Sequence, residues 1–443
     1  MTITDTYRIH EDWGSLTNPL RRSLEKQNGV TGTLVDTLHK LAFTQFQNTQ
    51  LPGKKNEDWK YTSMRELLNT QFSEPVFPGN GYIDLRSGIT ELDAACIVFV
   101  NGHLLLQLSD ELPAGVKLIT IQEAMKEKST LRLLEHMIAR LGSSMMTPFE
   151  ALTTSMTTPG VCLSIESDLQ LSRPLHFLHF TDSDSASPIY TYPYKLIGIG
   201  RNTSVDIVES FVSLNNETVS FTNSVNHIMV ESGAHLRHHR LQDENAQSFH
   251  INMTRVYQEK DSAYSSIAVE LGSKLMRNNI EVLHCGTGIT SNLNGLFMAE
   301  DRQHTDTQTF IDHAQPRCES HELYKGILDG YARGVFNGKI IVRPDAQKTN
   351  AFQQNNTLVL SRNAIMDSKP QLEIFADDVK CSHGATIGQL DENAVFYLRS
   401  RGLNRNEASA LLQQAFVGEV LDKCTNEAVR NYLNQHVEAH HHE

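Results

Sequence analysis

A long run of short β-type segments between residues 161 and 390 constrains the fold of this 443-residue chain more than any other feature. Helical periodicity fades there, and clusters of Gly, Asn, Asp and Ser separate the segments. The segments that we expect to form strands are residues 194–199, 204–214, 225–230, 236–241, 267–271, 280–283, 334–342 and 358–361. Many short strands at close spacing indicate an all-β domain. A sandwich, a propeller and a β-helix all stay open, because no clean repeat separates them.

Helical patterns flank this β-rich region. We expect a mixed, mainly helical domain at residues 1–158, a β core at 159–390, a helical domain at 391–436 and a tail at 437–443. The histidines of the tail resemble part of a purification tag and are excluded from metal arguments. Near the N-terminus, residues 55–62 surround Trp59, for which packing is a better explanation than binding.

The C-terminal pattern predicts a capped helix. Asn404 stands three residues before Glu407, the spacing of a capping box with Asn at the cap. An apolar stripe follows, made by Leu411, Leu412, Ala415, Phe416 and Val420. We expect this stripe to pack, and we expect residues 404–436 to be removable without unfolding the β-rich domain.

Cys381 and His383 form the best chemical pair in the chain. Residues 373–379 alternate apolar and acidic residues and predict a strand, in which positions two apart share a face and lie about 6.6 Å apart. A thiolate and an imidazole suit zinc, iron or an iron–sulfur cluster. Such sites usually take about four protein ligands. The missing ligands must therefore come from elsewhere in the fold or from another chain.

The same stretch carries a family resemblance. Residues 377–388 read Asp-Asp-Val-Lys-Cys-Ser-His-Gly-Ala-Thr-Ile-Gly, and residues 396–402 read Phe-Tyr-Leu-Arg-Ser-Arg-Gly. Together they closely resemble the signature of the SufD subunits, which are scaffolds of the SUF iron–sulfur cluster assembly complex. The paralogous SufB subunits carry His-Glu-Ala-Thr in place of residues 383–386 and Phe-Tyr-Cys in place of residues 396–398. The chain therefore resembles SufD more than SufB.

This resemblance implies a central right-handed parallel β-helix between an N-terminal α-rich domain and a C-terminal helical domain. It implies a non-catalytic scaffold that pairs with a SufB-like subunit and binds a SufC-like ATPase through residues 391–436. His383 would give a ligand to iron or to the nascent cluster at the SufB interface, with no permanently bound cofactor. Whether Cys381 is also a ligand stays open, since an unshifted thiol with a pKa of about 8.5 is mostly protonated at neutral pH. A homodimer of the isolated chain also stays open.

Charge and missing motifs narrow the function classes. The net charge of −13 argues against nucleic acid and anionic membrane as partners. The start of the chain shows no secretory signal, and no apolar run approaches the ~20 residues of a membrane span, so we expect a cytoplasmic protein. The six cysteines are scattered, which favours reduced thiols over a disulfide framework.

The alternative from another class is a β-helix enzyme that acts on polysaccharide. Such an enzyme is more often secreted and needs a carboxylate or basic cluster in a groove. A hydrolytic Cys381–His383 pair would also need a third, orienting residue, and the surrounding motif supplies none.

No phosphate-binding loop is present, because residues 334–340 read Gly-x-x-x-Gly-Lys-Ile. We therefore expect the pure chain to hydrolyse no ATP, and turnover that survives removal of contaminants would contradict this.

Overall fold

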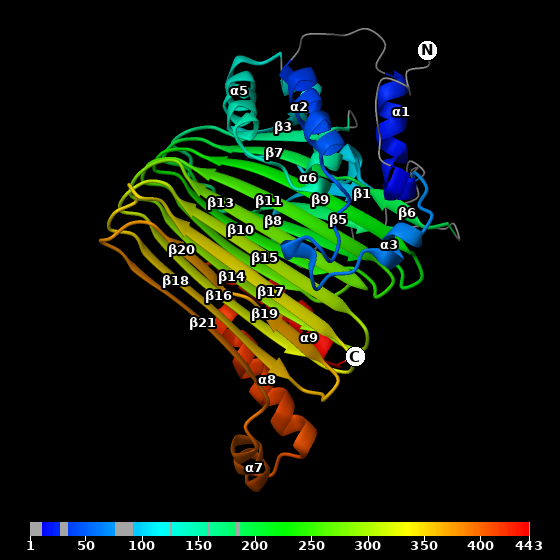
Figure 1. Ribbon diagram of the computed structural model, residues 1–443, viewed down its shortest axis with the longest axis vertical. Helices are drawn as coiled ribbons and strands as arrows, with labels where there is room; N and C mark the ends of the chain where they lie inside the picture. The colour runs from blue at the N-terminus through cyan, green and yellow to red at the C-terminus, as the bar shows by residue number, and fades with distance from the viewer. Residues whose placement is uncertain are drawn as a thin grey trace.

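The computed structural model describes residues 11–26, 34–75, 92–124, 126–156, 160–182 and 187–442. Two long sheets wind into a β-solenoid, with helices over its first coils and a helical segment after its last coil (Figure 1). Sheet A has 11 strands in the order β19-β17-β15-β13-β11-β9-β7-β4-β3, and β20 and β6 pair with β17 and β9. Sheet B has 10 strands in the order β2-β1-β5-β8-β10-β12-β14-β16-β18-β21.

The strands range from 2 residues (His103–Leu104) to 11 residues (Ser220–Val230). Those of sheet A are β3 (Val116–Thr120), β4 (Val161–Ile165), β6 (Ile189–Thr191), β7 (Tyr194–Ile199), β9 (Ser220–Val230), β11 (Phe249–Gln258), β13 (Leu275–His284), β15 (His304–His313), β17 (Arg333–Val342), β19 (Ile365–Ser368) and β20 (Gln371–Ile374). Those of sheet B are β1 (Ala95–Val100), β2 (His103–Leu104), β5 (Leu175–Thr181), β8 (Ser204–Ser213), β10 (His235–Asp243), β12 (Ala263–Glu270), β14 (Thr290–Ala299), β16 (Glu319–Leu328), β18 (Asn350–Val359) and β21 (Lys380–Gly388).

Each coil contributes a strand to each sheet, and neighbouring coils pair in parallel. Tight turns join the strands. At two of these turns Asn202 and Asp261 both have a φ of 56°. Asn and Asp tolerate this left-handed conformation better than most other residues with a Cβ. This explains why clusters of such residues punctuate the sequence of the β-rich region.

The interior of the solenoid has an apolar stripe and a polar stripe. On sheet A the apolar stripe is a row of β-branched side chains in register, and burying each contributes about 1.5 to 3 kcal/mol: Ile228, Val256, Val282, Ile311 and Ile340. Buried polar side chains from both sheets form the other stripe, including Asn226, Asn252, Glu270, Asn278, Thr307, Glu322 and Gln353. These polar groups pair largely with one another, so the interior fixes the register of the coils as well as their packing.

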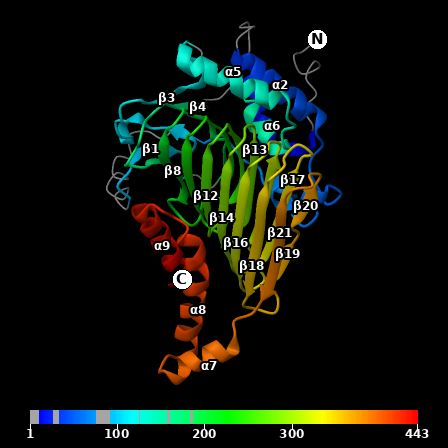
Figure 2. The same cartoon turned by 90° about the vertical axis from the view of Figure 1, so that its left-hand side faces the viewer.

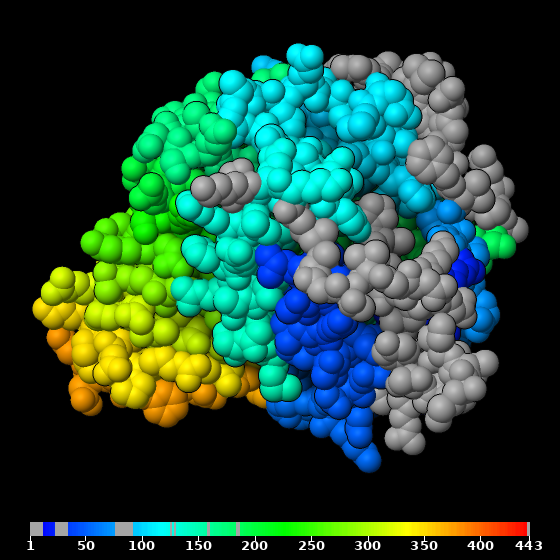
Figure 3. Space-filling view, turned by 90° about the horizontal axis from the view of Figure 1, so that it is seen from above, coloured from blue at the N-terminus to red at the C-terminus, as the bar shows by residue number. Residues whose placement is uncertain are grey.

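The N-terminal helices cover the outer face of sheet A, where their atoms spread over the early coils (Figure 3). The helical elements of this part are η2 (Glu11–Thr17), α1 (Asn18–Lys26), α2 (Leu34–Asn48), η3 (Glu57–Trp59), α3 (Arg65–Asn69), η5 (Leu106–Leu108), α4 (Ile121–Ala124), α5 (Lys128–Gly142) and α6 (Pro148–Thr154). Phe149 of α6 contacts the rings of Trp13 and Phe221 with centroids 4.9 and 6.1 Å apart. Trp59 is buried, with the Arg277 guanidinium 3.8 Å from its ring centroid, which confirms its packing role.

Three C-terminal helices follow the last strand: α7 (Glu392–Ser400), α8 (Arg405–Leu421) and α9 (Glu427–His442). The predicted capping box is confirmed, because the Glu407 backbone N–H donates to Asn404 Oδ1 at 3.0 Å and the Asn404 N–H donates to Glu407 Oε2 at 2.7 Å. Helices α8 and α9 run along the outer face of sheet B, whereas α7 projects away from the solenoid (Figure 2). Helix α9 includes most of the residues that we expected to form a tail.

The predicted apolar stripe of α8 is only partly correct. Val420 is buried, but Leu411 is 46% exposed. Residues on a different part of the helix, Val417 and Leu421, join Val420 in a cluster with apolar side chains of sheet B such as Ile267. Deleting residues 404–436 would uncover this cluster. The contacts therefore argue against our expectation that these helices can be removed without harm to the β-rich domain.

The sequence predicted about half of the solenoid strands. Residues 194–199 match β7, and the expected segments at 204–214, 225–230, 236–241, 267–271, 280–283 and 334–342 fall largely on single strands. The segment at 358–361 overlaps β18 only at Leu358 and Val359, because β18 ends there. The solenoid strands that were missed are β4, β5, β6, β11, β14, β15, β16 and β19. The expected domain boundary at 158–159 lies outside the described residues, and β1 to β3 from the preceding part extend both sheets.

Among the helices that the structure describes, none is both long and apolar enough to cross a membrane.

Candidate functional site

Strand β21 carries both predicted ligands and ends the solenoid. It pairs with β18 on one side and stands last in the order of sheet B. The prediction of a strand at residues 373–379 is wrong, because β20 stops at Ile374 and β21 starts at Lys380. The acidic residues at 377–378 lie in the turn between them. Cys381 and His383 still share a face, since both lie within β21 at alternate positions.

That shared face is the inner side of sheet B. Cys381 pairs in register with the fully buried Ala351 and packs against the interior apolar cluster. His383 pairs with Gln353, which in turn pairs with Glu322. Because no further coil covers β21, His383 is exposed although its neighbours in the row are buried. The pair therefore sits at the mouth of the interior, open toward whatever abuts the last coil.

The side chains of the two predicted ligands, Cys381 and His383, differ in burial. Partial burial raises the pKa of the Cys381 thiol, so less thiolate is present at neutral pH than for an exposed cysteine. His383 is solvent-exposed and its imidazole is accessible. In the described ranges no three His, Cys, Asp or Glu side chains converge as a metal site would require. Within those ranges, β21 brings one thiol and one imidazole to a common face, and no third side chain of these types joins them in a metal-binding group.

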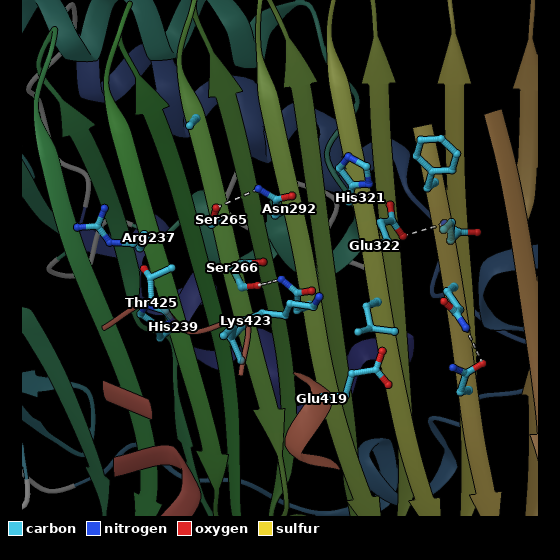
Figure 4. Close-up of a pocket in the computed structure, with 18 of the residues that line it drawn as sticks. Arg237, His239, Ser265, Ser266, Asn292, His321, Glu322, Glu419, Lys423 and Thr425 are labelled. Carbon is cyan, nitrogen blue, oxygen red and sulfur yellow. Dashed lines mark hydrogen bonds between the residues drawn. The ribbon is translucent and has the colours of Figure 1, made fainter. Parts of the chain in front are cut away.

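The inner row behind His383 holds a buried carboxyl and a buried amide. Gln353 Nε2 donates to Glu322 Oε2 at 2.8 Å, and Figure 4 labels Glu322. Thr309 Oγ1 donates to the same oxygen at 2.8 Å. Glu322 and Gln353 are 4% and 3% exposed. Burial raises the pKa of Glu322 to about 7, against which these two hydrogen bonds act. The row thus places a carboxyl group with a pKa raised to about 7 two strands away from His383.

A cleft of about 870 Å³ lies on the outer side of the same strands. Its floor presents amides, hydroxyls and the parallel rings of His321 and Phe352, whose centroids are 5.3 Å apart. Glu419 and Lys423 of the C-terminal segment form one wall (Figure 4). Two carboxyl groups belong to the residues that line the cleft. Glu419 is tied to Lys325, and Glu322 is 4% exposed and hydrogen-bonded to Thr309 and Gln353 in the interior.

A second polar cluster lies on the outer face of sheet B, around Asp206. His239 Nε2 lies 3.3 Å from Asp206 Oδ1, and Arg237 holds the same carboxylate with two hydrogen bonds of 2.8 and 2.9 Å. Cys424 Sγ lies 3.9 Å from His239 Nδ1, beneath the turn between α8 and α9. Cys424 is 2% exposed. This cluster fastens the C-terminal segment to sheet B, and its Arg237 and His239 also line the cleft.

Comparison with known proteins decides the family. Residues 180–416 match the family described as SUF system FeS cluster assembly, SufBD core domain, and residues 16–177 match the SufBD protein N-terminal region. The chain belongs to the SufBD family. An iron–sulfur cluster assembly SufBD family protein of Synechocystis is 34% identical over 436 residues, covering 94% of this chain and 93% of that protein. The iron–sulfur cluster assembly protein SufD of Escherichia coli is 32% identical over 391 residues, covering 88% and 89%.

Membership of the SufBD family agrees with the SufD-like signature of β21 and α7. It makes the chain a SufD-like component of iron–sulfur cluster assembly, and it does not favour the polysaccharide-acting alternative. The solenoid expected from the resemblance is present, flanked by N-terminal helices and a C-terminal helical segment. The SufBD core match covers the later coils and reaches into α8.

The sequence did not predict Glu322 and Gln353 as neighbours of His383 in the inner row of sheet B. Gln353 belongs to a run of amide residues at 353–356, which lies within β18. The neighbours of Gln353 in register are Glu322 and His383. Only the spacing between coils could have revealed these neighbours.

Glu322 predicts a pH dependence of stability. Its pKa is about 7 in the folded chain and near 4.5 when unfolded, so the folded state holds the extra proton between these values and the free energy of unfolding falls as pH rises through them. We expect Glu322→Gln to remove this loss, which amounts to about 3 kcal/mol at most between pH 5 and 8. Urea denaturation at both pH values measures it. Equal pH dependence in the variant and the parent protein would contradict the prediction.

Proposed function

We propose that this chain is the scaffold subunit that pairs with a SufB-like subunit at the open end of the solenoid and there offers His383 to iron or the nascent cluster. The observation that carries the proposal is the position of β21. It bears His383 and Cys381, it ends sheet B, and its second edge has no neighbouring strand among the described residues. An unpaired strand edge is a template for pairing with another chain.

Exposed apolar side chains around this edge support a partner at the same place. Four large ones belong to the last coil: Ile365, Ile374, Phe375 and Ile387, with exposed fractions of 51%, 41%, 60% and 52%. Apolar side chains gathered on one end of a chain mark an interaction surface more often than chance exposure does. A SufB-like subunit bound there would supply the ligands that Cys381 and His383 leave missing.

The proposed ATPase contact lies on the C-terminal helices. On α7, Phe396 and Tyr397 are 71% and 57% exposed, and Leu411 on α8 is also exposed. Helix α7 and the start of α8 project beyond the solenoid (Figure 2), where a separate subunit can reach them. Because the sequence contains no phosphate-binding loop, ATP hydrolysis is assigned to a SufC-like partner.

The ligand role is tested by His383→Ala in the complex of full-length subunits. Loss of the imidazole should lower bound iron and sulfide several-fold after anaerobic reconstitution, while the subunits still associate, because the side chain is exposed before the partner binds. Cys381→Ser belongs in the same experiment, since serine is a much poorer ligand for soft metals. The Cys381→Ser variant should lose as much bound iron and sulfide as His383→Ala only if the thiolate is also a ligand.

Ser382→Ala is the matched control. Ser382 lies between the two candidates but on the opposite, outer face of β21, where it borders the cleft. The control should keep normal cluster content. Full cluster content in His383→Ala would remove His383 from the mechanism, whereas loss of subunit association would assign it a structural role.

A further inference from the structure

A chain of hydrogen-bonded polar side chains runs through the solenoid interior toward β21. Such a chain is unusual inside a domain, because buried polar groups are costly unless each finds a partner. The chain has two segments. The links of the first, with their distances, are Lys195–Asn226 at 3.3 Å, Asn226–Thr254 at 3.4 Å, Thr254–Asn252 at 3.1 Å, Asn252–Asn278 at 2.9 Å, Asn278–Glu270 at 2.7 Å and Glu270–Thr307 at 3.2 Å. The second segment starts at Thr309, two positions further along the inner face of β15, with Thr309–Glu322 at 2.8 Å and Glu322–Gln353 at 2.8 Å. The chain ends at Gln353, one strand before His383.

The last two side chains of this chain, Glu322 and Gln353, each have a buried oxygen that accepts no hydrogen bond from a described residue. Gln353 Nε2 donates to Glu322 Oε2, but Gln353 Oε1 and Glu322 Oε1 are buried and have no hydrogen-bond partner among the described residues. An amide oxygen and a carboxylate oxygen can only accept hydrogen bonds, whereas a protonated carboxyl group can also donate one. The end of the chain therefore lacks a donor. Since Nε2 faces Glu322 on β16, the opposite side of the planar amide, with Oε1, faces away from β16.

His383 is the neighbour on that side. It pairs with Gln353 in the parallel register of β18 and β21 and lies on the same inner face. Across the interior, Gly338 of β17 leaves room for the amide, because a Cβ there would lie 2.2 Å from Gln353 Nε2. The amide is thus confined by Glu322 and Gly338, while the exposed imidazole beside it is free to turn toward it.

We propose that Gln353, held in place by Glu322, positions His383 by accepting a hydrogen bond from one imidazole N–H. A neutral imidazole carries a single N–H, so this bond leaves the other ring nitrogen as the acceptor for metal. Histidines that bind metal usually donate their second nitrogen to such an oxygen, which fixes the tautomer and ring orientation. Gln353 is a positioning residue, and the inference rests on the proposed ligand role of His383.

Two measurements test this role. In the full-length chain labelled with ¹⁵N-histidine, the spectrum of His383 reports its tautomer; its signal is identified by its loss in His383→Ala. In the complex with the partner subunits, anaerobic titration with Fe(II) reports affinity. Gln353→Met removes the acceptor at nearly constant volume. We expect a single dominant tautomer in the parent chain, a mixture in the variant, and Fe(II) binding roughly 10- to 100-fold weaker.

Gly338→Ala and Gln354→Met complete the set. The Cβ of Gly338→Ala would displace the Gln353 amide without altering Gln353 itself, so it should reproduce both effects even if Gln353→Met fails to fold. Gln354 is the adjacent amide on the outer face of β18 and borders the cleft; Gln354→Met should leave tautomer and affinity unchanged. An unchanged His383 tautomer in both Gln353→Met and Gly338→Ala overturns the inference. Unchanged Fe(II) affinity in His383→Ala instead overturns the proposed function.

Discussion

Arg255→Met is expected to lower the free energy of unfolding by about 3 to 5 kcal/mol, because it leaves a buried carboxylate without its partner. Arg255 Nε and Nη2 donate to the two oxygens of Glu150 at 3.0 and 2.9 Å, and its Nη1 lies 2.9 Å from Glu281. The Glu150 side chain is fully buried. Arg255 and His227 hold the pKa of Glu150 at about 2 despite its burial.

This network joins the N-terminal helices to the solenoid. Glu150 belongs to α6, where it closes a capping box with Thr147, while Arg255 and His227 belong to β11 and β9 of sheet A. Loss of the guanidinium should therefore free α6 from sheet A before the later coils unfold. Urea denaturation gives the free energy, and hydrogen exchange of α6 and of the late strands gives the order of opening.

Arg140→Met is the matched control for Arg255→Met. Arg140 Nη2 lies 2.9 Å from Glu259 Oε1, but its side chain is 42% exposed. An exposed pair of this kind contributes about 0 to 1 kcal/mol. A loss in Arg255→Met no larger than in Arg140→Met would show that the buried network is dispensable.

Phe396→Asp combined with Leu411→Glu should weaken binding of a SufC-like ATPase by about a hundredfold, which corresponds to about 2.8 kcal/mol. Both side chains are exposed on helices beyond the solenoid, so a charge is tolerated in the free chain but not in an apolar contact with a partner. Titration calorimetry with the purified ATPase measures the affinity. Far-ultraviolet circular dichroism should show unchanged helix content.

Leu106→Asp serves as the control for the ATPase contact. Leu106 on η5 is 72% exposed, in the N-terminal part of the chain. The Leu106→Asp variant should bind the ATPase with the affinity of the parent protein. If the double variant on α7 and α8 also retains full affinity, the ATPase docks elsewhere.

The sequence predicted strands best where the inward side chains are apolar. Strand β7, Tyr194–Ile199, is buried throughout and was recognised at its full length. Strand β15 reads His-Thr-Asp-Thr-Gln-Thr-Phe-Ile-Asp-His, and its inward Thr305, Thr307 and Thr309 hydrogen-bond to buried carboxyls. A polar inward row removes the alternation on which strand prediction depends.

The repeat of the solenoid was hidden for the same reason. One inner row of sheet B is formed, coil by coil, by His238, Ser266, Leu293, Glu322, Gln353 and His383. The positions are equivalent in space, but their chemistry changes from coil to coil. The Cys381–His383 pair was predictable because both ligands lie on one strand. Its neighbours Glu322 and Gln353 come from other coils, and no local spacing connects them.

The coiled construction also makes the protein a spacer whose length changes only in whole steps. Adding or removing one coil would move the end face by one strand separation, about 4.8 Å, and would leave β21 with the same orientation. Inserting a single residue into a strand would instead turn the inward side chains that follow it outward, because the side-chain period of a strand is two. The distance between the N-terminal helices and the face that bears His383 is therefore set by the number of coils, and a partner that spans both must match a multiple of that step.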